Sequence, residues 1–588
     1  MGVSSLASRI LRVNMKDRKV DYEEVADKYR LRGGRWLTSS IVCDEVDPLC
    51  HPLGAGNKVV MAPGIVTGTS SPTSARISVG AKSPLTGTIK EANSGAKFSQ
   101  QIARLGIKAI VIEGRPAEED KFWMLELNKD GSKLVPTPSN WIGRGLYPTV
   151  PLLYRKYGDK VGLMAIGVAG EMKMPMAGVC FNDIEGRPSR YAGRGGLGAV
   201  LGSKGLKFIV VDDADAPGVE IVNKDLFETG RKKLTDALMT HAITKPKGSL
   251  NAYGTAVLIN IINEAGGLPT RNFSKGTFEG AAKIAGEAIF EGNRKRLGKE
   301  LYNHACSPGC IIQCSNTWHK RDGKEHTSCI EYESDWALGA NCGIDSLDTI
   351  AELNQLCNEY GIDTIEAGGT LAVAMEAGIA KFGDGRKAIR LMHEIGRGTS
   401  LGRILGGGAT VAGKVFGVAR VPSVKGQNMP AYEPRAIKGI GVTYATSTMG
   451  ADHTSGYTIC PEILSVGGKA DPLTPDKKGE LSRNFQAATA FIDTSGHCLF
   501  IAFAILDIAS GFEGMVEECN GVLGTSWTGD DVTKIGLEVL RMERGFNETA
   551  GFTKAHDRLP DFMKHEKLPP HNTVFDVPDD VLDSVYAF

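Results

Sequence analysis

The sequence predicts an α+β fold, in which a β-rich N-terminal part is followed by two mainly α-helical parts. Short runs of β-branched and aliphatic residues dominate up to about residue 212. From Asp225 onward, apolar residues instead recur at steps of three and four, which is the period of an amphipathic helix. A stretch with Pro, Gly and Lys at residues 419–426 marks a seam within the helical half. We therefore expect domains at residues 1–212, 213–420 and 421–588.

Individual segments can be assigned in both halves. In the N-terminal part we expect strands at residues 58–62, 75–80, 107–113 and 122–127. The last strand continues through Asn128-Lys-Asp-Gly131 to Leu134-Val135, a pattern typical of a hairpin. In the helical parts we expect helices at residues 226–238, 256–262 and 347–360.

The composition disfavours several classes of function. A chain of 588 residues is too long for one ordinary domain, and its 68 Lys and Arg residues balance 68 Asp and Glu residues. A formal net charge of zero indicates no basic surface for nucleic acid or membrane lipid. The N-terminus lacks an apolar signal segment, and no apolar run reaches the roughly 18 residues of a spanning helix. We expect a cytoplasmic protein, and its 12 cysteines fit a reducing compartment.

Three cysteines lie close together in Cys306-Ser-Pro-Gly-Cys310-Ile-Ile-Gln-Cys314, and Cys498 follows far along the chain. Thiolates suit a four-iron cluster, whose ligands often consist of a tight triplet and one distant cysteine. A structural zinc site and unrelated buried cysteines are the alternatives. Zinc is disfavoured because no second cysteine pair or nearby histidine pair completes a tetrahedron. The pattern therefore indicates an iron–sulfur site and electron transfer.

Glycine is frequent, with 73 residues where average usage predicts about 41. Within residues 190–204, Arg194 stands directly before Gly195 and Gly196, and Gly198 follows. Backbone N–H groups and fixed cations in such a loop suit a phosphate or a polar cofactor. A glycine-rich turn between packed elements has a similar sequence. The stretch contains neither GxGxxG nor GxxxxGK[ST], so neither a dinucleotide loop nor an NTP loop is indicated.

Over nearly its whole length the chain resembles the tungsten-containing aldehyde:ferredoxin oxidoreductases. The matching segments, in family order, are ILRVNMKDRKV, PGIVTGTSSPTSARISVGAKSPLTGTIKEANSGAKF, GRGGLGAVLGSKGLK, GTAVLINIINEAGGLPTRNF, LCNEYGID and DTSGHCLF. The resemblance implies a β-rich domain that forms the base of a metal bis-pterin cofactor, two helical domains that cover it, and a [4Fe-4S] cluster beside one pterin. Two pterin dithiolenes hold the metal in this family, so the sequence does not separate tungsten from molybdenum.

The resemblance also assigns cofactor residues. The cluster ligands would be Cys306, Cys310, Cys314 and Cys498, although most relatives have CxxC where this chain has CxxxC. Asp493 and Gly496 match the pterin motif D-x-x-G-x-C, in which His497 replaces the usual Leu. Arg76 would lie between pterin and cluster, where its permanent charge stabilises anions. The remaining pterin or phosphate contacts would be Asn93, Gly95, Arg194, Gly195, Gly196, Gly198, Asn358, Gly361 and Asp363.

Glu333 and His453 match positions that lie near the metal in the family. Taken alone, each would more often be a surface group or a satisfied core group. Oxidation of an aldehyde to an acid adds a water-derived oxygen and removes electrons and protons, which calls for a base and for a hydrogen-bond donor to the carbonyl. The resemblance therefore implies that Glu333 manages the proton and that His453 polarises the carbonyl oxygen.

The resemblance implies ferredoxin or an iron–sulfur subunit as the electron acceptor, in a homodimer or a hetero-oligomer. One alternative is the same scaffold acting in aromatic acyl-CoA reduction or 2-hydroxy acid oxidation, with molybdenum as an alternative metal. A non-enzymatic electron carrier is disfavoured, because 588 residues exceed what a cluster alone requires. Glu352 corresponds to a position that binds a subunit-bridging iron in some dimers, but we find no convincing His partner and do not predict that ion.

Overall fold

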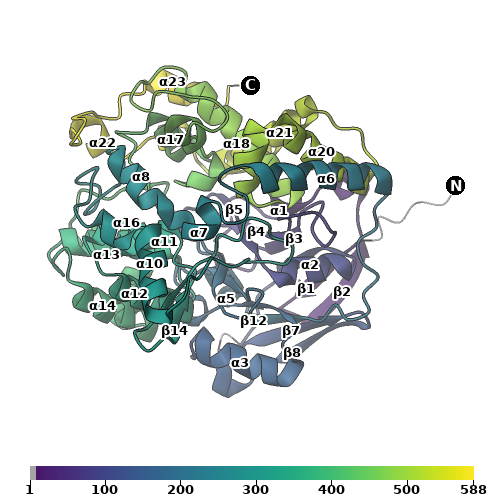
Figure 1. The fold of residues 1–588 in the computed structure, drawn as a ribbon. Helices are drawn as coiled ribbons and strands as arrows, with labels where there is room; N and C mark the ends of the chain where they lie inside the picture. Colours follow the sequence, from purple (N-terminus) through teal and green to yellow (C-terminus); the bar gives the residue numbers. More distant parts are fainter. Residues whose placement is uncertain (1–7, 119, 588) are drawn as a thin grey trace.

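A computed structural model describes residues 8–118 and 120–587. In Figure 1 the N-terminal part, coloured purple to blue, contains two β-sheets, whereas the teal to yellow remainder is mainly helical. Within the described residues, the strands outside these two sheets form only two short hairpins. This arrangement confirms the predicted α+β fold class.

The first sheet has the strand order β2-β1-β6-β3-β4-β5 and is antiparallel except between β1 and β6. Strands β4 and β5 pair Arg76 with Gly95 and Ser78 with Asn93. Because side chains alternate along a strand, Arg76 and Asn93 lie on the face opposite to Ile77, which enters the core. The strand bounds are β1 Arg9–Asn14, β2 Lys19–Glu24, β3 Val59–Pro63, β4 Arg76–Lys82, β5 Ile89–Gly95 and β6 Ile107–Glu113.

The second sheet has the order β11-β10-β9-β12-β7-β8, and only β7 and β12 run parallel. Side chains of both sheets share one buried cluster, in which the rings of Phe98 and Phe181 lie 5.2 Å apart. The two sheets therefore pack on a common core. The strand bounds are β7 Trp123–Asn128, β8 Gly131–Pro136, β9 Gly162–Ala165, β10 Val179–Phe181, β11 Arg190–Ala192 and β12 Leu206–Val211.

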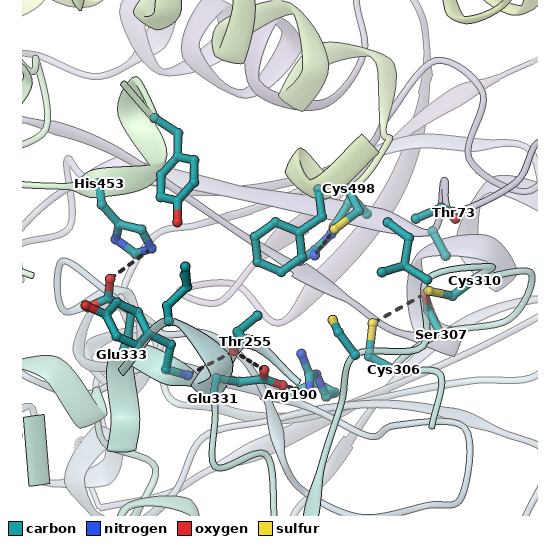
Figure 2. A pocket seen from close by; sticks show the side chains of 18 of the residues that line it. Thr73, Arg190, Thr255, Cys306, Ser307, Cys310, Glu331, Glu333, His453 and Cys498 are labelled. Atoms are coloured by element: carbon teal, nitrogen blue, oxygen red, sulfur yellow. Dashed lines mark hydrogen bonds and ion pairs between the residues drawn. The ribbon is translucent and has the colours of Figure 1, made fainter. Parts of the chain in front are cut away.

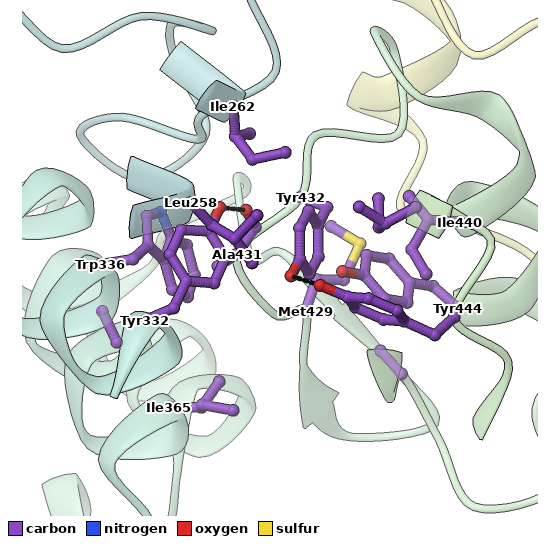
Figure 3. Close-up of a cluster of buried hydrophobic side chains, with 14 of the residues drawn as sticks. Leu258, Ile262, Tyr332, Trp336, Ile365, Met429, Ala431, Tyr432, Ile440 and Tyr444 are labelled. Atoms are coloured by element: carbon purple, nitrogen blue, oxygen red, sulfur yellow. Dashed lines mark hydrogen bonds between the residues drawn. The ribbon is translucent and has the colours of Figure 1, made fainter. Parts of the chain in front are cut away.

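The helical half shares a single large hydrophobic cluster, which includes residues from both sides of the predicted seam near residue 420. Figure 3 shows Tyr332 and Trp336 from the earlier part facing Tyr432 from the later part. The boundary between the two helical domains therefore stays a prediction. The principal helices are α6 Lys224–Thr240, α11 Tyr332–Leu338, α12 Leu347–Tyr360, α13 Thr364–Glu376, α17 Lys438–Thr446, α18 Lys478–Ser495, α20 Ala509–Leu523 and α21 Gly529–Thr549.

The structure confirms the expected segments to within two residues at each end, and the hairpin forms between β7 and β8. For the segment expected at residues 256–262, a short turn at Thr255–Val257 leads into α8 at Leu258–Glu264. The N-terminal part also contains helices that the sequence analysis did not predict, including α1 Gly34–Glu45 and α3 Leu146–Tyr157. No single helix among the described residues is both long and apolar enough to cross a membrane.

A buried ion pair joins the N-terminal part to the C-terminal helices. Arg35 on α1 donates two hydrogen bonds to Glu543 on α21, at 2.9 and 2.8 Å, and the two residues are 2% and 0% exposed. The hydroxyl groups of Ser39 and Thr448 donate to the same carboxylate, at 2.8 and 2.6 Å. Both charges are thus satisfied without water, which is the condition under which a buried pair is tolerated.

We predict that Arg35→Met will lower the free energy of unfolding by about 3–5 kcal/mol, because Glu543 would stay buried without its counter-charge. Denaturant titration measures the change. Arg397→Met is the control, since Arg397 pairs with Glu394 in a pair whose Arg side chain is 64% exposed, and such pairs contribute about 0–1 kcal/mol. Equal decreases in the free energy of unfolding for the two variants would show that the buried pair contributes no more to stability than an exposed pair.

Candidate functional site

The four predicted cluster ligands line one cavity, although they come from distant parts of the chain. Cys306, Cys310 and Cys314 lie on an irregular loop after α10 (Gly286–Leu297), and Cys498 follows the end of α18. Figure 2 shows the labelled thiols on one side of this cavity and the side chains of Glu333 and His453 on the other. The fold thus brings the predicted cluster ligands and the predicted catalytic residues to one cavity.

Thr73 connects the two cysteine segments. Its backbone N–H donates to the Gly309 carbonyl and its own carbonyl accepts from the Cys498 N–H, both at 2.9 Å. Its Oγ1 also accepts from the N–H of Ile311, at 3.1 Å. The sequence analysis missed Thr73, because a residue that acts through its backbone leaves no motif.

The four thiols of the predicted cluster ligands face one cavity. All four cysteines are unbridged and line the same cavity, yet no group of three or more metal-ligating side chains among the described residues could hold one ion. A zinc ion needs four ligands about 2.0–2.3 Å from one point, whereas a cluster takes thiolates that stand farther apart. The choice between an iron–sulfur cluster and zinc therefore stays a prediction.

Two partly buried arginines, Arg76 and Arg190, lie beside the thiols. An Nη2 group of Arg76 is 2.8 Å from Cys498 Sγ. A hydrogen bond from the Cys310 thiol, with Arg190 and Arg76 adding to its effect, holds the pKa of Cys306 well below its usual value. Fixed cations near thiols favour thiolates, which are the form that binds metal.

A chain of hydrogen bonds links Arg76 to the buried ion pair of the fold. Arg76 Nη1 donates to Asn93 Oδ1 at 3.4 Å, and Asn93 Nδ2 donates to Asp493 Oδ1 at 3.0 Å. The other Asp493 oxygen accepts from Arg35 at 3.4 Å. Three of the predicted cofactor residues are therefore oriented by one network.

Close contacts require glycine at two predicted positions. A Cβ atom at Gly95 would lie 3.0 Å from Cys306 Sγ, and one at Gly496, where φ is +92°, would lie 2.3 Å from Thr67 Oγ1. The remaining predicted glycines pack against the protein itself, so packing alone accounts for them: Gly195, Gly196, Gly198 and Gly361. Contacts of these four with a cofactor stay a prediction.

A second cavity adjoins the first and shares Arg76, Glu333, His453 and Cys498 with it. Its lining also includes the predicted cofactor residues Asn93, Arg194, Asn358, Asp363 and Asp493. The two cavities together thus hold the cluster cysteines, the catalytic candidates and the side chains expected to contact pterin.

Within the second cavity, Arg194 Nε lies 3.3 Å from Asp363 Oδ2. Asp363 Oδ1 accepts from the N–H of Ile365 and so caps the first turn of α13. Asn358 on α12 donates weakly to the Ser328 carbonyl at 3.4 Å. These contacts give Asp363 a structural role in addition to its predicted one.

Glu333 and His453 form the pair that the sequence analysis proposed. Glu333 Oε1 lies 3.4 Å from His453 Nε2, and Glu333 Oε2 accepts from the N–H of Ala431 at 2.9 Å. Glu333 Oε1 and His453 Nδ1 are buried and have no hydrogen-bond partner in the described part of the protein. Buried polar atoms without partners are costly, and in a cavity they are available to a ligand.

Burial places the proton of this pair on the carboxyl group. It raises the pKa of Glu333 to about 8 and lowers the pKa of His453 to about 4. The negative charge of Asp452 raises the pKa of His453, whereas the positive charges of Arg194 and Lys90 lower it further. At pH 7 the protonated Glu333 faces a neutral imidazole. If the carboxyl group donates to Nε2, the remaining ring proton lies on Nδ1.

Sequence reasoning missed Arg190, whose role depends on residues far along the chain. Its Nη1 contacts Ser315 Oγ at 2.9 Å, Cys329 Sγ at 3.1 Å and Glu331 Oε1 at 3.3 Å, and it lines both cavities. In the sequence, only its position at the start of the glycine-rich stretch pointed to a role for Arg190. Arg190 holds a second fixed charge between cluster thiols and the catalytic pair.

Glu91 was also missed. Alternation along β5 places it on the same face as Asn93, and it lines the second cavity with Oε1 unpartnered. His497, which departs from the family motif, turns toward other partners: Nε2 lies 3.0 Å from both Ser71 Oγ and Glu518 Oε2, and Nδ1 lies 2.9 Å from Ser495 Oγ. Its ring therefore supports the turn that carries Cys498.

Comparison with known families covers almost the whole chain. The family described as the aldehyde ferredoxin oxidoreductase N-terminal domain matches residues 10–213, and the family described as its domains 2 and 3 matches residues 230–588. The chain belongs to the aldehyde ferredoxin oxidoreductase family. This is a family of oxidoreductases, which confirms the enzyme class implied by the resemblance.

Individual relatives agree with this placement. The tungsten-containing aldehyde ferredoxin oxidoreductases of Pyrococcus horikoshii and Pyrococcus furiosus are 37% and 36% identical, over 95% of this chain and 92% of each relative. The WOR-like subunit of an aliphatic sulfonate oxidoreductase from Pyrococcus furiosus is 24% identical, over 91% of this chain and 85% of its own.

A solved structure shares the fold at low sequence identity. The active-site complex BamBC of benzoyl coenzyme A reductase, in complex with 1,5-dienoyl-CoA, superposes with a TM-score of 0.76 and 16% identity, over 98% of this chain and 93% of that chain. At this identity the similarity shows a common fold and does not carry over a substrate.

One detail of the sequence analysis is wrong. Glu352, the family position of a bridging iron, does have a histidine neighbour, because His326 Nε2 lies 2.9 Å from Glu352 Oε2. His326 stands on a hairpin strand, β14 Glu325–Ser328, and sequence spacing does not show that this strand packs on α12. No third metal-ligating group joins the pair among the described residues.

We predict that stability falls as pH rises from 6.5 to 8. The pKa of Glu333 is raised in the folded protein, so stability that is present below about pH 4.5 is lost as pH rises toward 8. The lowered pKa of His453 has the opposite effect, since it makes stability fall as pH decreases, but it acts only below about pH 6.5. Above that pH the carboxyl group dominates, by up to about 1.4 kcal/mol for each pH unit.

Thermal unfolding midpoints between pH 6.5 and 8 measure this effect. Glu333→Gln removes the titrating proton while its amide oxygen can still accept from Ala431, and its midpoint should depend less on pH than that of the native protein. Glu359→Gln serves as the comparison, since Glu359 accepts from the N–H of Tyr147 but lies outside the two cavities. Parallel pH profiles for native protein and Glu333→Gln would contradict the raised pKa.

Proposed function

We propose that this chain oxidises aldehydes to carboxylic acids, or runs the reverse reaction, at a tungsten or molybdenum bis-pterin centre. Electrons would pass through a [4Fe-4S] cluster to ferredoxin or a partner subunit. The observation that carries the proposal is that four free thiols, Arg76, Glu333 and His453 all line one cavity in a member of this family. Twelve unpaired cysteines support a reducing compartment, and we propose the cytoplasm.

The residues present fit these groups. Cys306, Cys310, Cys314 and Cys498 would hold the cluster. Asn93, Asp493 and Glu91 would offer carboxyl and amide groups to a pterin. Buried Arg194 and the partly buried Arg76 and Arg190 supply positive charge, which matches thiolates and phosphate groups. When bound, the metal centre would supply the two-electron redox chemistry of the reaction.

The protein's own residues would manage substrate and protons. Oxidation of RCHO with water gives RCOOH, two protons and two electrons. His453 Nδ1 has no hydrogen-bond partner among the described residues and lies 3.8 Å from Asp452 Oδ1, and its N–H would donate to the carbonyl oxygen and polarise it. Glu333 would accept a proton during oxidation, and because its pKa is about 8 it would also return that proton during acid reduction at neutral pH.

The cavity wall around this pair is largely aromatic. The rings of Tyr432 and Tyr457 lie 6.0 and 6.1 Å from the His453 ring, and their hydroxyl groups bond to each other at 2.6 Å. Such a wall excludes water from the carbonyl and strengthens each polar contact made to it.

We predict that Cys498→Ala will lower iron to well under four atoms per chain and abolish electron transfer, because a four-iron cluster needs four thiolates. Iron analysis and visible absorbance measure the loss. Cys519→Ala is the matched control, since Cys519 is another buried cysteine but lies outside both cavities. Unchanged iron and absorbance in Cys498→Ala would show that Cys498 is not a ligand.

We further predict that Glu333→Gln and His453→Phe will lose roughly 10²–10⁴-fold in turnover while keeping metal, pterin and cluster. The loss should fall on kcat and kcat/KM together, because both groups act mainly in the transition state. The assay is aldehyde-dependent viologen reduction by preparations whose tungsten, molybdenum and iron contents are measured.

The pH profile separates a proton-transfer role from a structural one. In the native protein, aldehyde oxidation should rise with pH through about 8 and acid reduction should fall, and Glu333→Gln should lose this dependence. Near-normal kcat in Glu333→Gln would place the base elsewhere. Activity without either metal would contradict the bis-pterin centre, and turnover of an aromatic acyl-CoA or a 2-hydroxy acid in place of aldehydes would favour the alternative reactions.

A further inference from the structure

Arg190 lies at the boundary between the two halves of the functional site. Its side chain lines both the cavity of the cluster thiols and the second cavity. In Figure 2, Arg190 lies between Cys306 on one side and Glu333 on the other. Arg190 pairs with Phe181 in the second sheet, so its backbone is held by the fold. A guanidinium group keeps its charge at any ordinary pH, and a permanent positive charge therefore stands at this boundary.

The side chain of Arg190 contacts the end of the cluster loop. Its Nη1 group lies 2.9 Å from the hydroxyl oxygen of Ser315, which directly follows Cys314. The same Nη1 group lies 3.1 Å from the sulfur of Cys329. The backbone N–H of Cys329 donates to the Asn316 carbonyl at 2.9 Å, so two segments of the chain meet at Arg190. Burial raises the pKa of the Cys329 thiol, so this sulfur adds no charge.

Glu331 extends this contact toward the catalytic residues. Its Oε1 atom lies 3.3 Å from Arg190 Nη1, and its Oε2 atom accepts a hydrogen bond from Thr255 Oγ1 at 2.8 Å. Thr255 Oγ1 in turn accepts from the N–H of Tyr332 at 2.9 Å. Tyr332 is the first residue of α11, and Glu333 directly follows it. Arg190 is thus connected both to the cluster loop and to the helix that carries Glu333.

Arg190 and Arg76 approach the cluster thiols from different parts of the chain. Arg76 lies 2.8 Å from Cys498 Sγ, whereas Arg190 contacts the segment that follows Cys314. Among the described residues, Glu331 is the one acidic group that forms an ion pair with Arg190. The reduction potential of an iron–sulfur cluster depends on nearby charge, because each added electron adds a negative charge. A cation therefore stabilises the reduced cluster, and an anion destabilises it.

We propose that Arg190 and Glu331 form a charge pair that sets the reduction potential of the cluster, and thereby its ability to accept electrons from the catalytic site. The inference rests on the proposed [4Fe-4S] cluster and specifies which side chains tune it. Oxidation of one aldehyde releases two electrons, which pass one at a time through the cluster to ferredoxin or a partner subunit. The charge of Arg190 favours the reduced state of the cluster, and the charge of Glu331 limits that effect.

The test is a redox titration of the cluster, followed by visible absorbance without any aldehyde. Arg190→Gln should make the midpoint potential more negative, by at least roughly a tenfold change in the one-electron equilibrium constant, or about 59 mV. Glu331→Gln should shift the potential in the opposite direction, because it removes a negative charge while its amide oxygen can still accept from Thr255. Shifts of opposite sign identify charge as the cause, since a loosened fold does not follow the sign of the removed charge.

Arg187→Gln is the matched control. Arg187 stands just before β11, its side chain is 18% exposed against 12% for Arg190, and it lines neither cavity. Its charge is balanced by Asp183 and Glu325, so this variant should keep the native potential. Arg190→Lys keeps the positive charge and should stay closer to the native potential than Arg190→Gln does. All of these variants should retain iron, because none of them removes a thiol.

The outcomes separate this inference from the proposed function. An iron-replete Arg190→Gln with the native potential, or shifts of the same sign in Arg190→Gln and Glu331→Gln, would overturn the charge pair while leaving aldehyde oxidation intact. If Arg190→Gln does not retain iron, the sign of the shift in Glu331→Gln decides. If the opposite shifts appear but no aldehyde is turned over, the proposed reaction fails and the charge pair stands. A native protein without iron would overturn the cluster and the charge pair together.

Discussion

The geometry of the site depends on the buried ion pair between Arg35 and Glu543. Two charges without water are tolerated only when every donor and acceptor around them is satisfied, and here that condition requires α1 of the sheet part to meet α21 of the helical part. From Arg35 the hydrogen bonds continue through Asp493, Asn93 and Arg76 to Cys498. An interdomain contact and a cysteine of the cluster motif are thus parts of one network.

Nearby anions explain why several arginines lie at low exposure around the two cavities. A guanidinium group keeps its charge at any ordinary pH, so each one in a dry cavity must face an anion. Protein carboxylates provide some partners, for example Asp363 for Arg194 and Glu331 for Arg190. The thiols beside Arg76 provide others, which is why the cations favour metal-binding thiolates.

Sequence reasoning recovered the parts of the structure with a clear local period or motif. The strand at residues 107–113 and the helix at residues 347–360 were predicted to the residue, and that helix has a Ser346 cap and ends at Gly361. Helix α1 was missed because it is buried on nearly all sides and so has no amphipathic period, and α3 was missed because it contains Pro151.

At the site, too, residues in a recognisable sequence motif were predicted and residues without one were missed. The number and spacing of the cysteines singled out a group that the fold brings to one cavity, and the family resemblance singled out Glu333 and His453, which line the same cavity. Thr73, Arg190 and the His326–Glu352 pair could not be predicted, because their roles arise when loops and strands far apart in the chain meet. Backbone hydrogen bonds and long-range contacts leave no local pattern to read.

The cavity that contains Glu333 and His453 has an aromatic wall, and this wall sets the protonation of His453. The aromatic wall of Tyr432 and Tyr457 removes water from the imidazole, and burial is the main cause of its lowered pKa. A neutral imidazole can donate to a carbonyl without adding a charge that would need its own partner. A more polar wall would therefore let water return to His453, raise the pKa of its imidazole and weaken this neutral donor.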